Sequence, residues 1–79
     1  MARVALYGKL ADAAGWRERS IEADTLASLT SQIAAGQPAL AAALDASRVV
    51  VLVNDVVTRE DRALRDTDDV AFLPPMSGG

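Results

Sequence analysis

The residues with the clearest chemical potential are the last seven, which read Leu73-Pro74-Pro75-Met76-Ser77-Gly78-Gly79. A Pro-Pro pair is stiff and extended, so it projects whatever follows away from the preceding strand. Ser-Gly-Gly has almost no side-chain bulk, and glycine adopts nearly any backbone conformation. We therefore expect residues 74–79 to form a slender, flexible tail whose carboxylate, at Gly79, threads into a narrow site on another protein. The alternative is an inert, frayed end, which is common at chain termini.

The rest of the chain offers little catalytic chemistry. It has no cysteine and no histidine, which excludes disulfides, thiolate catalysis, thiolate metal sites and the commonest general base. Lys9 is the single lysine, and the arginines are interleaved with acids, as in Arg17-Glu18-Arg19. That pattern is typical of a solvated face, and a net charge of −3 does not favour nucleic acid, whose phosphates require clustered basic residues. We expect no metal site, no nucleic-acid partner and no catalysis by this chain alone.

Length and composition indicate one small folded domain, because 51% of the 79 residues are hydrophobic and only 24% are charged. No apolar stretch approaches the roughly 20 residues that span a bilayer. The opening Met1-Ala2-Arg3-Val4 lacks the apolar core and cleavage site of a signal peptide. We expect a cytoplasmic protein without a membrane partner.

Periodicity, caps and turn residues predict a β-α-β-α-α-β-β-β order, a mixed sheet with helices on one side. In chain order we expect a strand at 3–7, a short helix at 9–14 closed by Gly15, a strand at 16–23, a helix capped by Asp24 or Thr25 and stopped by Gly36, a helix beginning at Pro38, strands at 48–53 and 56–58 joined by Asn54-Asp55, and a strand at 70–73 ended by Pro74-Pro75.

Strand parity predicts that both faces of this sheet are apolar. If Val4, Leu6, Val70 and Phe72 face the core, the opposite face collects Ala5, Tyr7, Val50, Leu52, Ala71, Leu73 and one of Val56 or Val57. A solvated sheet face normally alternates to polar residues, and a contiguous exposed apolar patch marks a protein interface. We expect a partner protein to cover this face; the alternative is that the polar segment 59–69 folds back over it.

The motifs together resemble a known family. The ending Asp68-Asp69-Val70-Ala71-Phe72-Leu73-Pro74-Pro75-Met76-Ser77-Gly78-Gly79 is similar to the D-E-V-A-F-F-P-P-V-x-G-G ending of the small subunit of molybdopterin synthase, in the ubiquitin-like family of sulfur carriers. The opening Val4-Ala5-Leu6-Tyr7-Gly8 resembles its V-x-F-F-A strand, and Val53-Asn54 matches its V-N. The chain departs from the family at Leu10-Ala11-Asp12, where many members carry L-R-E, at Thr67 and at Met76.

The resemblance implies an α+β fold, the ubiquitin-like β-grasp, over residues 1–73, followed by the tail 74–79. It implies that a ubiquitin-activating-enzyme-like adenylyltransferase uses ATP to adenylate Gly79, and that a sulfur donor converts it to a thiocarboxylate. The large catalytic subunit of molybdopterin synthase then receives the tail residues Pro74, Pro75, Met76, Ser77 and Gly78, and sulfur passes to a cyclic pyranopterin phosphate. No cofactor is expected to bind stably, and the complex is expected to be a heterotetramer.

By the same resemblance, Tyr7, Val57 and Leu73 form the partner-binding face. Three other functions stay open: sulfur carriage for thiamin, cysteine or tRNA thiolation, a ubiquitin-like protein modifier, and an interaction domain with an inert tail.

Overall fold

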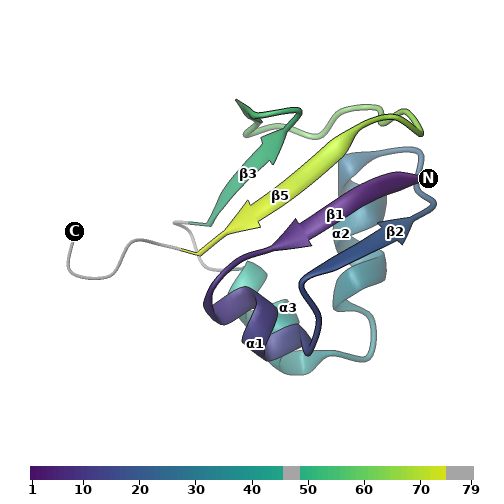
Figure 1. The fold of residues 1–79 in the computed structure, drawn as a ribbon. Coiled ribbons are helices and arrows are strands. Elements are labelled where there is room, and N and C mark those ends of the chain that lie inside the picture. The colour runs from purple at the N-terminus through teal and green to yellow at the C-terminus, as the bar shows by residue number, and fades with distance from the viewer. Residues whose placement is uncertain (46–48, 75–79) are drawn as a thin grey trace.

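A computed structural model of the chain, described over residues 1–45 and 49–74, has a five-stranded sheet with three helices on one face (Figure 1). The elements are β1 (Ala2–Leu6), α1 (Lys9–Ala14), β2 (Glu18–Ile21), α2 (Leu26–Ala34), α3 (Pro38–Leu44), β3 (Val50–Val53), β4 (Val56–Val57) and β5 (Asp69–Leu73). Their order confirms the predicted succession of strands and helices.

The sheet has the strand order β2-β1-β5-β3-β4. The first and last strands, β1 and β5, lie side by side in its centre and run parallel, with Val4 opposite Val70 and Leu6 opposite Phe72. All the other neighbouring strands are antiparallel. This mixed sheet with helices on one side is the α+β arrangement of a β-grasp, as predicted.

Local sequence signals explain where the helices begin and end. The Thr25 hydroxyl caps α2 by accepting a hydrogen bond from the Ser28 backbone N–H at 3.1 Å, which settles the choice between Asp24 and Thr25. Gly15 ends α1 in the left-handed conformation, with φ 83°. Pro38 occupies the first turn of α3, where its missing N–H costs no helical bond.

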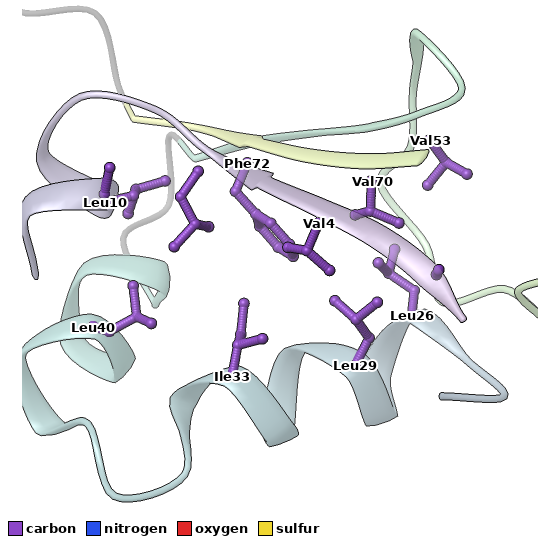
Figure 2. Close-up of a cluster of buried hydrophobic side chains, with 12 residues drawn as sticks. Val4, Leu10, Leu26, Leu29, Ile33, Leu40, Val53, Val70 and Phe72 are labelled. Carbon is purple, nitrogen blue, oxygen red and sulfur yellow. The ribbon is translucent and has the colours of Figure 1, made fainter. Parts of the chain in front are cut away.

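The core lies between the sheet and the helices. Figure 2 shows side chains from β1, β3 and β5 converging on those from α2 and α3. Val4, Leu29 and Leu40 are fully buried, and Val70 and Phe72 are nearly so. The expected periodicity of α2 is confirmed because Leu26, Leu29 and Ile33 all point into this core. Since the core uses only one face of the sheet, the other face is left without helical cover.

Three strands, β2, β3 and β4, are shorter than predicted, and β4 ends at Val57, one residue before the expected Thr58. The strand expected at 16–23 is reduced to β2, an edge strand on which Arg19 lies against the Trp16 ring, 4.6 Å from its centroid. The strand expected at 48–53 begins at Val50, and Arg48 lies outside the described residues. The β3–β4 hairpin turns at Asn54 and Asp55, both with positive φ (52° and 68°), which confirms the predicted turn.

A buried carboxylate ties this hairpin to β5. Asp68 is 5% exposed, and its Oδ1 accepts a hydrogen bond from Asn54 Nδ2 at 2.9 Å. Its Oδ2 accepts one from the Arg65 backbone N–H at 2.8 Å. Asn54 in turn accepts from the Asp69 backbone N–H at 2.9 Å. The hydrogen bonds that Asp68 accepts, that from Arg65 having the largest influence and that from Asn54 the next, hold its pKa below the ordinary value of 3.8.

Asp68 should therefore make the stability of the fold depend on pH. A carboxyl group whose pKa is depressed by folding stabilises the native state above its unfolded pKa, and this contribution is lost as pH falls through the lower folded value. We expect Asp68→Asn to lower the melting temperature at pH 7, and the difference from wild type to shrink between pH 4 and pH 2.

The matched control is Asp66→Asn, because the Asp66 side chain is 90% exposed and forms an exposed ion pair with the N-terminal amine, at 3.1 Å. Thermal unfolding followed by circular dichroism across this pH range makes the measurement. Parallel pH profiles for wild type and Asp68→Asn would contradict the assignment.

Candidate functional site: an uncovered sheet face and the root of the tail

The sheet face opposite the helices is apolar across four strands. Strand pairing places Ala5 beside Ala71, Ala71 beside Leu52, and Leu52 beside Val57, all pointing the same way. A second row runs from Tyr7 to Leu73 and Val50. We call this set the outer face: Ala5, Tyr7, Val50, Leu52, Val57, Ala71 and Leu73. These residues are the ones that strand alternation predicted for this face. Of the two valines left open, Val57 lies on it and Val56 does not.

The outer face is open to solvent in the monomer. Tyr7 is 52% exposed, Val57 53% and Val50 39%, while the other members are half-buried. The alternative, in which segment 59–69 folds back over this face, is wrong, because that segment is bonded to the start of α2 instead. The Leu26 N–H donates to the Arg62 carbonyl at 2.9 Å, and the Ala27 N–H to Asp61 Oδ1 at 2.8 Å.

Charged side chains border the apolar surface. The small side chains of Ala5 and Ala71 leave a shallow hollow of about 210 Å³ in its centre, which Arg3, Glu18, Asp55 and Asp69 also line. Arg3 Nε and Glu18 Oε1 are 3.7 Å apart and both side chains are exposed, so this pair contributes little to stability. An apolar centre with a polar rim is the anatomy of a protein interface.

The tail begins at the edge of the outer face. Leu73 is the last residue of β5 and points onto this face beside Tyr7, whose backbone N–H donates to the Phe72 carbonyl at 3.2 Å. Pro74, half-buried, follows directly. The structure thus brings Tyr7, Leu73 and Pro74 together. Val57 lies two strands away from β5, on the edge strand β4. The predicted tail positions Pro75, Met76, Ser77, Gly78 and Gly79 lie outside the described residues.

Two other kinds of site are absent from the described residues. Within 1–45 and 49–74, no cluster of acidic side chains is placed to hold a metal ion. No helix in that part of the chain is long and apolar enough to cross a membrane. This arrangement suits docking through the outer face, at whose edge β5 ends.

Two contacts near the site could not be predicted from sequence. One is the bond from Asn54 to Asp68, which fixes the hairpin that carries Val57. The other is a close approach between Gly8 and Pro74. For the first contact the sequence shows only an Asn-Asp turn, and for the second only a glycine directly after a strand. Neither signal identifies the distant residue that it contacts.

Fold and surface together define a small β-grasp protein whose sheet has one uncovered apolar face. The ThiS family model matches residues 4–79, and the chain belongs to this family. Two curated relatives are named molybdopterin synthase sulfur carrier subunit. The one from Escherichia coli K12 is 31% identical over 81 residues and covers 100% of both chains. The one from Chlamydomonas reinhardtii is 36% identical over 81 residues, covering 98% of this chain and 96% of its own.

Solved structures confirm the ubiquitin-like fold. The small archaeal modifier protein 1 of Methanosarcina acetivorans matches with a TM-score of 0.87 and 24% identity, covering 99% of this chain and 95% of its own. The protein of the same name from Haloferax volcanii matches with a TM-score of 0.81 and 26% identity, covering 99% and 98%. The predicted fold and the resemblance to ubiquitin-like sulfur carriers are thereby confirmed.

If the outer face serves docking, its side chains should matter little to the stability of the isolated chain. Val57→Thr, on the outer face, is expected to change the free energy of unfolding by no more than about 0.5 kcal/mol. The matched substitution Val53→Thr buries a hydroxyl at a site 1% exposed and should cost about 1–3 kcal/mol. Urea denaturation of both variants makes the comparison, and equal losses would show that Val57 is a structural residue.

Proposed function

We propose that this protein is the sulfur-carrier subunit of a molybdopterin synthase, loaded with sulfur as a thiocarboxylate at Gly79. The observation that carries the proposal is the full-length similarity to curated sulfur carrier subunits, at 31% and 36% identity. The geometry supports it, because β5 ends at the edge of the uncovered apolar face. A partner that covers this face therefore meets the root of the tail.

The chemistry at Gly79 follows from the low reactivity of a carboxylate. A glycine carboxylate is ionised at neutral pH and is a poor electrophile. Attack of its oxygen on the α-phosphorus of ATP expels pyrophosphate and gives an acyl-adenylate, whose AMP is a good leaving group. The terminal sulfur of a persulfide then displaces AMP, and a thiol cleaves the resulting disulfide to release the thiocarboxylate. The soft, ionised sulfur is a strong nucleophile and stays covalently attached.

Two protein partners are needed, since the chain has neither cysteine nor histidine to catalyse these steps. A ubiquitin-activating-enzyme-like adenylyltransferase performs the activation. The large catalytic subunit of the synthase takes up the tail and supplies the groups that transfer sulfur to a cyclic pyranopterin phosphate. The outer face, with Tyr7, Val57 and Leu73, binds these partners, and residues 74–79 reach their active sites. The chain is then a sulfur-donating subunit without catalytic residues of its own.

A protein modifier is the second candidate. The observation that favours it is the 26% identity, over 99% of this chain, to the small archaeal modifier protein 1 of Haloferax volcanii. The same activated Gly79 would then form amide bonds with lysines of other proteins. Sulfur carriage for another pathway would use the same loading chemistry and differ only in the acceptor.

Loading can be tested directly because the chain contains no thiol of its own. The purified protein is incubated with its host's adenylyltransferase, ATP and a persulfide donor, then alkylated with a thiol-reactive reagent, and its intact mass is measured. We expect one ATP-dependent adduct that maps to Gly79. Alkylation is required because methionine oxidation adds nearly the same mass as replacing oxygen by sulfur.

Deletion of Gly79 is the control and should abolish the adduct while leaving the melting temperature unchanged. A known sulfur carrier is labelled in parallel. If that carrier is labelled and this chain is not, sulfur carriage is ruled out. Conjugates of higher mass in a cell lysate would then support the modifier.

Docking can be tested with two neighbouring valines of β4. Val57 lies on the outer face opposite Leu52, whereas Val56, opposite the buried Val53, points to the other side. Both are largely exposed, at 53% and 63%. Val57→Asp should weaken binding to the large synthase subunit at least about tenfold, because it places an unpaired charge in an apolar interface. Val56→Asp should leave the dissociation constant within about twofold.

Isothermal titration calorimetry measures both dissociation constants. Equal effects of the two substitutions would show that the outer face is not the contact surface.

A further inference from the structure

The turn between β1 and α1 lies directly against the root of the tail. Gly8 has φ 54° and ψ −129°, a conformation that other residues rarely adopt. A Cβ atom at this position would stand 3.0 Å from Cγ and 3.8 Å from Cδ of Pro74. Carbon atoms attract best at about 3.5–4.0 Å, so the added atom would press into the proline ring. The bare Gly8 backbone is thus a seat for Pro74.

The seat is held in place from both sides. The backbone N–H of Tyr7 donates to the Phe72 carbonyl at 3.2 Å, which joins the turn to β5. On the helix side, the Leu10 N–H donates to the Tyr7 carbonyl at 3.1 Å and the Asp12 N–H to the Gly8 carbonyl at 3.2 Å. Leu10 is 1% exposed and anchors α1 in the core. A collision at Gly8 would therefore be relieved by moving Pro74, which stands beyond the last paired residue of β5.

We propose that Gly8 is a positioning residue for the tail. It lets the Pro74 ring lie on the β1–α1 turn and so sets the position of the residue after which the sequence continues to Gly79. The inference rests on the proposed function, in which Gly79 is activated inside a partner's active site. Pro74 and Pro75 form a stiff pair, so a displacement at Pro74 is passed outward along the tail. A misplacement of about 1 Å at a reacting group can lower a rate by two orders of magnitude.

A positive φ at a glycine does not by itself produce a close contact such as that between Gly8 and Pro74. Gly15 and Gly36 also have positive φ, 83° and 69°, yet a Cβ at either position would meet nothing within 4 Å. Gly15→Ala therefore tests the substitution of a positive-φ glycine without any collision, but Gly15, at φ 83° and ψ 13°, lies in the left-handed α region, which alanine adopts at lower cost than the Gly8 conformation. It controls for a positive-φ substitution, and the Pro74→Ala background controls for the greater backbone strain at Gly8 itself.

The test measures the kinetics of thiocarboxylate loading by the adenylyltransferase, with alkylation and intact mass as the readout. Gly8→Ala should lower kcat at least about tenfold while KM for the carrier stays within about twofold, because the outer face is untouched. Gly15→Ala should leave both constants within about twofold. In a Pro74→Ala background, where the ring is absent, the effect of Gly8→Ala on kcat should shrink to within about twofold.

The outcomes separate the positioning role from a structural one. Equal losses for Gly8→Ala and Gly15→Ala, or a full loss that persists in the Pro74→Ala background, would overturn the inference. If thermal unfolding shows that Gly8→Ala does not fold, the single variant Pro74→Ala tests the inference instead. A lower kcat at unchanged KM supports the positioning role of the Gly8–Pro74 contact, and an unchanged kcat refutes it. Failure to load the wild-type chain would instead overturn the proposed function, and this inference with it.

Discussion

The parallel pairing of β1 with β5 is the constraint on which the rest of the structure depends. It joins the two ends of the chain in the centre of the sheet and aligns Val4 with Val70 and Leu6 with Phe72. Those four side chains lie on the sheet side of the core, and the helices cover them (Figure 2). The same register places Tyr7 beside Leu73 on the opposite face. Because side chains alternate along a strand, one register determines both the core and the outer face, and a slip by one residue would exchange them.

A domain of this size has too few residues to cover both faces of its sheet. Small chains bury a limited fraction of their surface, and here the three helices of the described residues all lie on one side (Figure 1). The apolar outer face is therefore left uncovered in the isolated chain, and its burial becomes available to a partner. Alanine at positions 5 and 71 limits the exposed apolar area in the centre of this face, while the charged rim opposes non-specific association.

The sequence predicted the parts of this structure that depend on local signals. Thr25, Pro38 and Gly15 act within a turn or two of their own position, and the alternation in 70–73 shows which side chains share a face. Contacts between distant segments could not be predicted in this way. Asn54 meets Asp68, and Gly8 meets Pro74, only because β3 and β1 both pair with β5 in a particular register. The ends of the edge strands, β2 and β4, were also poorly predicted, because strand ends depend on pairing rather than on propensity.

In the proposed carrier, the outer face and the start of the tail form one continuous surface. Tyr7 and Leu73 lie on the docking surface, and Pro74 follows Leu73 directly, so a partner that engages the tail also covers this part of the face. If the proposed function holds, the enzyme that activates Gly79 and the subunit that accepts its sulfur compete for one surface and bind in turn. Such exchange requires that neither complex be too stable. A small apolar centre with an exposed, weakly paired charged rim, as formed by Arg3 and Glu18, suits repeated association and release better than a large permanent interface.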